Sequence, residues 1–167
     1  MNTAEYYITH LQLQRHPEGG FYKETYRSVE TLAQQALPNR FSGDRAFSTT
    51  ILFLVPGNTF SAFHRIAADE GWHFYTGAAL DIYVIYEDGR AELKKLGANL
   101  AAGESFQHIV PAGAWFASKC SDENSFSLVG CTVAPGFDFA DFEMGKQQEL
   151  LTLFPQHQDW ITKLCRL

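Results

Sequence analysis

The sequence predicts an all-β sandwich or barrel with short helices at both ends. Between Phe21 and Phe139 no helical periodicity is sustained, and short runs rich in β-branched and aromatic residues alternate with turn residues. The 167 residues are 46% hydrophobic and 14% aromatic, which is enough for one core with an aromatic lining but not for two. We therefore expect a single domain over residues 1–167, with its β core at about 20–140.

The strands are predicted from β-forming runs bounded by turn signals. Asp88-Gly89 is the clearest hairpin signal, and an inverse turn there needs positive φ at both central positions. The mostly polar segment 28–44 predicts a long loop, with or without a helical turn. The expected strands are 21–27, 47–55, 60–66, 72–76, 80–86, 91–96, 106–110, 115–118 and 126–133.

Helices are expected only near the two ends. Residues 3–14 predict an amphipathic helix capped by Thr3, and Pro17 cannot continue it. The apolar stripe of this helix consists of Ala4, Tyr7, Ile8 and Leu11. Pro155 separates two further helices, 146–154 and 156–164.

Charge, cysteine content and hydropathy limit which partners and which cellular compartment we expect. Thirteen Lys and Arg against nineteen Asp and Glu give a formal net charge of −6, without a dense basic run, so no nucleic-acid partner is expected. The three cysteines lack metal or redox spacing, which suits a reducing compartment. Because we find neither a signal peptide nor an apolar run that could span a bilayer, we expect a cytoplasmic protein without a membrane partner.

The spacing of four residues in the middle of the chain predicts a functional site. His64 is followed by Ile66, then by Glu70 and Gly77, at intervals that resemble the first motif of the cupins. In that motif a His-x-His pair on one strand aims two imidazoles into a barrel, because residues two apart share a face. Here Ile66 stands in place of the second His.

A second segment resembles the second cupin motif. Pro111-Ala112-Gly113 precedes Phe116, which occupies the usual His position, and Cys120 stands where that motif has Asn. Neither Ile66 nor Phe116 can coordinate a cation, and two remaining ligands seldom hold one. We therefore expect no cofactor and less than one equivalent of metal.

Five segments of the sequence are similar to one cupin subfamily, often called cupin family 5. The resemblance implies a dimeric cupin jelly-roll barrel (a double-stranded β-helix) with short terminal helices and a polar, aromatic pocket. Members of this subfamily are often described as sugar epimerases, by similarity to the deoxysugar-nucleotide epimerases of rhamnose synthesis. The segments that carry this resemblance are residues 16–20, 24–28, 60–65, 69–75 and 130–139.

The epimerase resemblance assigns roles to a few residues. In those enzymes a His removes the proton beside a sugar ketone, a carboxylate orients that His, and a Tyr acts as the acid. The resemblance makes His64 the base and offers Glu70 as the orienting carboxylate. The candidates for the acid are Tyr22, Tyr26, Tyr75 and Tyr83.

Other side chains are candidates for contacting the ligand. Gln107 is placed in the pocket by the resemblance, and Arg27 lies on a polar strand that lines the pocket or covers a partner. Strict alternation turns His73 outward, whereas a bulge at Gly71 would turn it inward, and both orientations stay open. The aromatic candidates, which either stack on a ring-shaped ligand or fill the core, are Phe63, Trp72, Phe74, Trp115 and Phe116.

Three classes of function follow for a small, carbohydrate-like ligand. The leading hypothesis is a metal-independent epimerase or isomerase of a sugar-like carbonyl compound, with His64 as general base. The alternatives are a non-catalytic metabolite-binding cupin and a metal-dependent cupin that uses His64, Glu70 and His73. In each case we expect a homodimer, because strand 21–27 can add to a neighbour's sheet.

Overall fold

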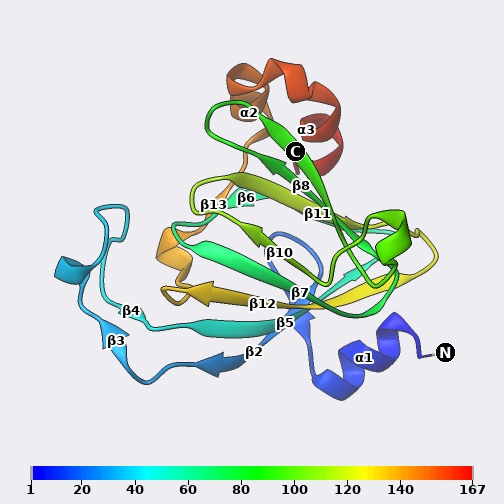
Figure 1. The fold of residues 1–167 in the computed structure, drawn as a ribbon, viewed down its shortest axis with the longest axis horizontal. Coiled ribbons are helices and arrows are strands. Elements are labelled where there is room, and N and C mark those ends of the chain that lie inside the picture. The colour runs from blue at the N-terminus through cyan, green and yellow to red at the C-terminus, as the bar shows by residue number, and fades with distance from the viewer. Residues whose placement is uncertain (1, 167) are drawn as a thin grey trace.

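The computed structural model describes residues 2–166 and contains two β-sheets that face each other (Figure 1). The larger sheet has six strands in the order β1 (Gln14–Arg15), β2 (Phe21–Arg27), β5 (Thr49–Pro56), β12 (Phe126–Ala134), β7 (Asp69–Gly77) and β10 (Gln107–Val110). The smaller sheet has five strands in the order β13 (Glu143–Met144), β6 (Phe60–Arg65), β11 (Trp115–Cys120), β8 (Leu80–Ile85) and β9 (Ala91–Leu96).

All strand pairings within these two sheets are antiparallel. The double sheet confirms the predicted jelly roll, although within residues 2–166 the sheets do not join into one closed, hydrogen-bonded barrel. Jelly rolls bury side chains between their two sheets, and this interior also contains the cavity described below.

Within residues 2–166, three α-helices cover the outside of the sheets. They are α1 (Ala4–Leu11), α2 (Gln147–Leu153) and α3 (Gln158–Leu164), and Figure 1 shows α2 and α3 together at one side of the molecule. Thr3 caps α1 as predicted, its hydroxyl accepting the Tyr6 N–H at 3.2 Å. This helix ends earlier than predicted, since Gln12 adopts a left-handed conformation with φ 57°. None of the helices in residues 2–166 is both long and apolar enough to cross a membrane.

The apolar side chains form two large clusters. Phe53, Trp72 and Ile82 belong to the core between the sheets. Phe63 and Trp115 project from the other face of the smaller sheet and pack under α2 and α3. Full burial of one such side chain is worth about 1.5–3 kcal/mol, so both clusters are large contributors to stability.

Two local predictions needed correction. The turn after β8 is not an inverse turn: Tyr86 N–H donates to the Arg90 carbonyl at 2.9 Å, and Gly89 has a positive φ of 81° whereas Asp88 does not. This pattern fits a three-residue loop with one left-handed glycine. The predicted loop 28–44 contains β3 (Thr31–Leu32), which pairs with β4 (Arg45–Ala46), and a 3-10 turn, η1 (Gln34–Ala36).

Candidate functional site

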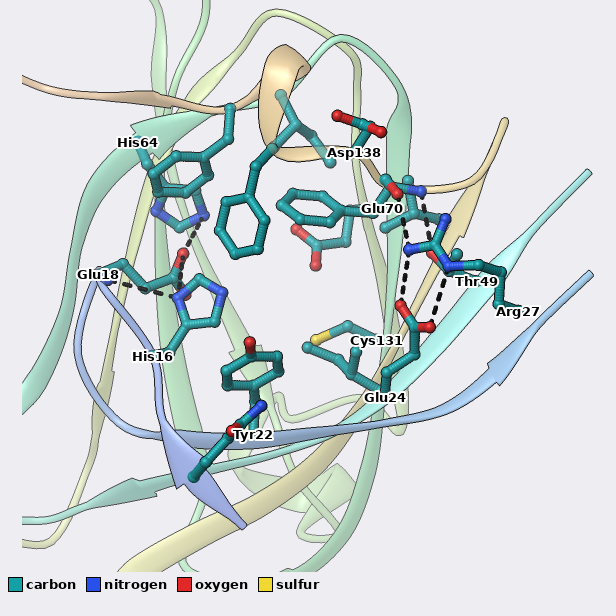
Figure 2. A pocket seen from close by; sticks show the side chains of 17 residues that line it. His16, Glu18, Tyr22, Glu24, Arg27, Thr49, His64, Glu70, Cys131 and Asp138 are labelled. Atoms are coloured by element: carbon teal, nitrogen blue, oxygen red, sulfur yellow. Dashed lines mark hydrogen bonds and ion pairs between the residues drawn. The ribbon is translucent and has the colours of Figure 1, made fainter. Parts of the chain in front are cut away.

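A cavity of about 420 Å³ lies inside the jelly roll (Figure 2). Strands β2, β5, β6, β7 and β12 contribute to its wall, together with the turn after β1 and the segment 137–142. Buried side chains, among them Glu18, His64 and Glu70, form the inner part. The exposed side chains of Glu24 and Arg27 define the mouth.

The turn over residues 16–20 brings a carboxyl group into this cavity. Gly19 has φ 116°, and a Cβ there would collide with the carbonyl oxygen of Phe60, so glycine lets the turn lie directly on β6. The Ala62 N–H donates to the Glu18 carbonyl at 2.9 Å and fixes this contact. The Glu18 side chain is thereby directed inward, beside His64 (Figure 2).

Glu18 is the carboxyl partner of His64. Its Oε2 lies 3.0 Å from His64 Nε2, and its Oε1 accepts the Ser61 hydroxyl at 2.8 Å. A register shift between β6 and β11 inserts an extra residue between Ser61 and His64, so both can approach the same carboxyl. His64 Nδ1 donates to the Ala62 carbonyl at 2.7 Å, which leaves one proton to be shared between Nε2 and Glu18.

Burial favours the uncharged form of this pair. Loss of solvent, reinforced by the nearby Glu70 carboxylate, raises the pKa of Glu18 well above its usual value, although the Ser61 hydrogen bond opposes the shift. Burial also lowers the pKa of His64 to about 3, against the raising effect of the Ala62 carbonyl. A neutral carboxylic acid donating to a neutral imidazole satisfies both directions.

His16 extends this cluster. Its Nδ1 lies 3.4 Å from Glu18 Oε2, and its ring meets the Tyr22 ring edge-on at 4.6 Å between centroids. Burial lowers the pKa of His16 to about 4, so this ring is also uncharged at neutral pH. Figure 2 shows the Tyr22 hydroxyl pointing into the cavity.

Glu70 supplies a second buried carboxyl. Burial raises the pKa of Glu70 to about 7, partly offset by the adjacent Cys131 thiol and Trp72 indole. The indole N–H of Trp72 is buried and approaches this carboxyl without ordinary hydrogen-bond geometry. Burial likewise raises the pKa of the Cys131 thiol, as does the nearby Glu70 charge. A carboxyl with a pKa near 7 can give or take a proton at neutral pH.

An ion pair lies at the mouth of the cavity. A register shift in β2 between Glu24 and Tyr26 changes the alternation, so that Glu24 and Arg27 share the cavity side. Arg27 donates to both oxygens of Glu24, at 3.0 and 2.7 Å, and to the Phe137 carbonyl at 3.1 Å.

Three of the sequence-predicted site residues line this cavity: His64, Glu70 and Arg27. Trp72 and Phe116 lie in the core beside it, and the Phe116 ring is 4.1 Å from that of His64. Phe63 and Trp115 point away, toward α2 and α3. They alternate with His64 and Phe116, which face the space between the sheets, and this alternation is the physical reason for the difference.

His73, Phe74 and Gln107 lie around a separate, shallow depression on β7 and β10. Gln107 Nε2 donates to His73 Nδ1 at 3.0 Å, and His73 Nε2 is 3.2 Å from the Thr132 hydroxyl. The pairing with β12 is regular at Gly71 and shifts only beyond Phe74, so His73 keeps the outward orientation that strict alternation gives.

Tyr22 is the candidate tyrosine that reaches the cavity. Tyr26 and Tyr75 are 53% and 51% exposed, and the Tyr83 ring packs against Trp160 at 5.0 Å. From the sequence, residues 16–20 served only as a segment of the family resemblance, and His16 and Glu18 were missed as residues of the site. The available signal was a charged residue beside two glycines, in a segment that resembles the cupin subfamily.

The residues present do not fit the metal site of metal-binding cupins. Ile66 lines the cavity and Phe116 is 1% exposed in the core, so two ligand positions are apolar. In residues 2–166 no group of three or more His, Cys, Asp or Glu side chains is arranged to hold a metal ion.

The jelly roll with its ligand-sized inner cavity defines a cupin. The family model of Cupin_5, described as Cupin superfamily (DUF985), matches residues 5–145, and this chain belongs to that family. An uncharacterised protein of Saccharomyces cerevisiae is 32% identical over 153 residues, which are 86% of this chain and 76% of the yeast protein.

Solved structures agree with this assignment. A protein from Shewanella oneidensis superposes with a TM-score of 0.90 at 42% identity, covering 99% of both chains. A hypothetical protein from Leishmania major gives 0.90 at 35% identity, covering 99% of this chain and 100% of the other. Oxalate decarboxylase from Bacillus subtilis, at 13% identity and TM-score 0.55 over 90% of this chain and 36% of that one, shares the fold alone.

Proposed function

We propose that the cavity binds a small, sugar-like carbonyl compound and transfers protons on it without a metal, as an epimerase or isomerase. One observation carries this proposal: two buried carboxyl groups with raised pKa face one cavity, and one of them has a pKa of about 7. Titratable groups shifted in this way cluster at catalytic sites, because acid–base chemistry needs pKa values near the working pH.

The proposal assigns the proton transfers to specific groups. The Glu70 carboxylate takes the proton from the carbon beside the carbonyl, and the electron pair moves onto the carbonyl oxygen. The Glu18–His64 pair gives its shared proton to that oxygen, so charge does not accumulate on the enediol. Collapse of the enediol returns a hydroxyl proton to the Glu18–His64 pair while carbon is reprotonated. In an isomerisation Glu70 gives its proton to the neighbouring carbon; in an epimerisation a water protonates the opposite face and the resulting hydroxide takes the proton from Glu70, which is again a carboxylate. His64 alone is a poor base in this site, because both ring nitrogens have protein partners.

Proton exchange with solvent tests the proposal. Free aldoses and ketoses and 4-keto sugar nucleotides are incubated with protein in D2O, and loss of C–H signals is followed by NMR. We expect exchange for at least one compound, slowed about a hundredfold or more by either His64→Ala or Glu70→Gln. His73→Ala is the matched control, since that ring lies on the outside, and it should leave the rate unchanged.

A non-catalytic binding cupin is the second candidate. It is favoured by the two hydrogen-bonded nitrogens of His64, which need no ligand to complete them. Compounds that bind the wild-type protein without any solvent exchange would support this candidate and contradict catalysis.

We also propose that the protein is a homodimer. Pairing with β1 covers β2 only at Phe21 and Tyr22, so its remaining edge is open to strand addition, and Tyr26 and Val29 nearby are 53% and 98% exposed. Light scattering should give twice the 18.8 kDa chain mass at micromolar concentration, and a monomer would contradict the proposal.

A further inference from the structure

We propose that the cavity takes an uncharged, single-ring polyhydroxy compound and rejects its phosphorylated and nucleotide-linked forms. This inference rests on the proposed function in one respect, that the cavity is the ligand site. It goes further, because the epimerases that suggested this chemistry act on sugar nucleotides.

The size of the cavity agrees with a single ring. Its volume of about 420 Å³ lies near the lower end of the ~300–1,000 Å³ range of small-molecule pockets. A free monosaccharide fits inside such a space. A nucleoside diphosphate sugar would have to place its phosphates in or beyond the mouth.

The inner wall offers no positive charge to an anion. His16 and His64 are uncharged at neutral pH, because burial lowers their pKa values to about 4 and 3. The other titratable groups there are the carboxyls of Glu18 and Glu70, the thiol of Cys131 and the phenol of Tyr22, and none of these groups carries a positive charge. A buried anion without a counter-charge is strongly unfavourable, so a phosphate or carboxylate group is excluded from this end.

The mouth carries a net negative charge. Arg27 is held by both oxygens of Glu24, and the nearby Asp138 carboxylate adds a second negative charge. Arg45, from β4, is held in the same way by Asp141, at 2.6 Å for both hydrogen bonds. One guanidinium against two carboxylates at the mouth leaves about one negative charge, which repels a phosphate leaving the cavity.

The same wall suits hydroxyl groups and sugar rings. Carboxyl oxygens, imidazole nitrogens and the Tyr22 hydroxyl accept or donate hydrogen bonds without requiring charge on the ligand. The aromatic rings of Phe137 and Phe142 line the cavity and present apolar faces to ring C–H groups. Uncharged hydrogen-bonding groups beside aromatic faces are complementary to a polyhydroxy ring.

Matched probes test the selectivity. D-glucose, D-fructose and D-xylose are compared with their monophosphates and with UDP-glucose, by saturation-transfer NMR and calorimetry at neutral pH. We expect at least one free sugar to bind, and at least about tenfold more tightly than its own phosphate, since one like charge at close range costs on the order of 1 kcal/mol or more.

Two variants with the same change of charge sharpen the test. Glu24→Gln frees Arg27 and should reduce the preference for the free sugar about tenfold. Asp88→Asn removes a carboxylate from the distant β8–β9 turn and should leave the preference unchanged. An unchanged preference in Glu24→Gln, or equal shifts in both variants, would overturn the electrostatic explanation.

The outcomes separate this inference from the proposed catalysis. Binding of a phosphate or of UDP-glucose as tight as that of the free sugar overturns the inference, and so does the failure of every free sugar to bind. A phosphorylated sugar that exchanges its C–H overturns it while leaving catalysis in place. A free sugar that binds without exchange overturns catalysis and leaves the inference standing.

Discussion

The two faces of strand β6 carry opposite chemistry, although neighbouring residues supply them. Phe63 packs under the C-terminal helices with Leu150 and Ile161, in a cluster of buried apolar side chains. His64, the next residue, lies in the cavity at hydrogen-bond distance from Glu18. Adjacent residues of β6 therefore belong to two different environments, an apolar core and a buried polar cluster.

This difference separates the residues that stabilise the fold from those that are available for binding or reaction. The apolar face contributes free energy of folding in proportion to the area it buries. The polar cavity opposes folding, because burial disfavours the charged forms of Glu70, on β7 of the larger sheet, and of His64. The raised pKa of Glu70 lowers stability at neutral pH, whereas the lowered pKa of His64 lowers it only below about pH 6.5. Unfavourable burial of this kind is typical of sites that bind or react.

The largest expected effect tests the apolar face. Phe63→Ala should lower the free energy of unfolding by about 3–5 kcal/mol, because it leaves a cavity beneath α2 and α3. Chemical denaturation measures this loss, and Phe63→Leu should lose less than half as much. Binding of a free sugar to the folded variant should stay unchanged. A loss of binding with little loss of stability would break the division between the two faces.

The next effect tests the polar cavity through pH, at Glu70 of β7. Because burial raises the pKa of Glu70 from 4.5 to about 7, the wild-type protein should lose stability relative to Glu70→Gln as pH rises from 4.5 to 7. Below this window both folded and unfolded states hold the proton, and above it neither does. At about 1.4 kcal/mol per pKa unit the total loss is about 3 kcal/mol.

Denaturation curves of both proteins across this pH range give the difference, with the effects of His16 and His64 cancelling. Glu18 adds to the difference with the same sign, because the Glu70 charge helps to raise the pKa of Glu18. Glu92→Gln serves as a control of sign. The hydrogen bond from Tyr86 lowers the pKa of Glu92, so its contribution is lost on acidification instead. A pH-independent difference for Glu70→Gln would contradict a raised pKa.

Much of the fold followed from the sequence because its signals are local. Turn residues separated the β-forming runs, and the strand 21–27 was placed with its observed bounds. Very short strands such as β1 and β13 were missed, because two residues carry no periodicity. They exist through pairing with β2 and β6, which only the folded chain brings within reach.

The cavity was harder to predict, since it depends on changes of register. Alternation correctly separates Phe63 from His64, but the shifts near Glu24 and near Ser61 change which residues share a face. Glu18 lies more than 40 residues from His64 in sequence, on a turn with no periodic signal. Its role follows from the docking of that turn on β6, which composition and spacing do not encode.

The smallest expected effect concerns the stability of the Glu18–His64 pair. Glu18→Ala leaves the Ser61 hydroxyl and the His64 ring without a buried partner, which costs about 1–3 kcal/mol for each group. Removal of an unfavourably buried carboxyl offsets part of this, so we expect a net loss of about 2 kcal/mol. Glu18→Gln keeps an acceptor for Ser61 and a donor for Nε2, and should lose less than about 1 kcal/mol.

The protonation of His64 decides whether this explanation holds. In the neutral pair the proton stays on Nδ1, which donates to the Ala62 carbonyl, so NMR of the ring should show one uncharged tautomer between about pH 5 and 8. The same tautomer is expected in Glu18→Gln, since an amide also donates to Nε2. An imidazolium signal in the wild-type protein that disappears in Glu18→Gln would instead identify an ion pair. The Glu18–His64 ion pair would then stabilise the fold through charge, and the contrast between the two faces of β6 would no longer be one of stability against function.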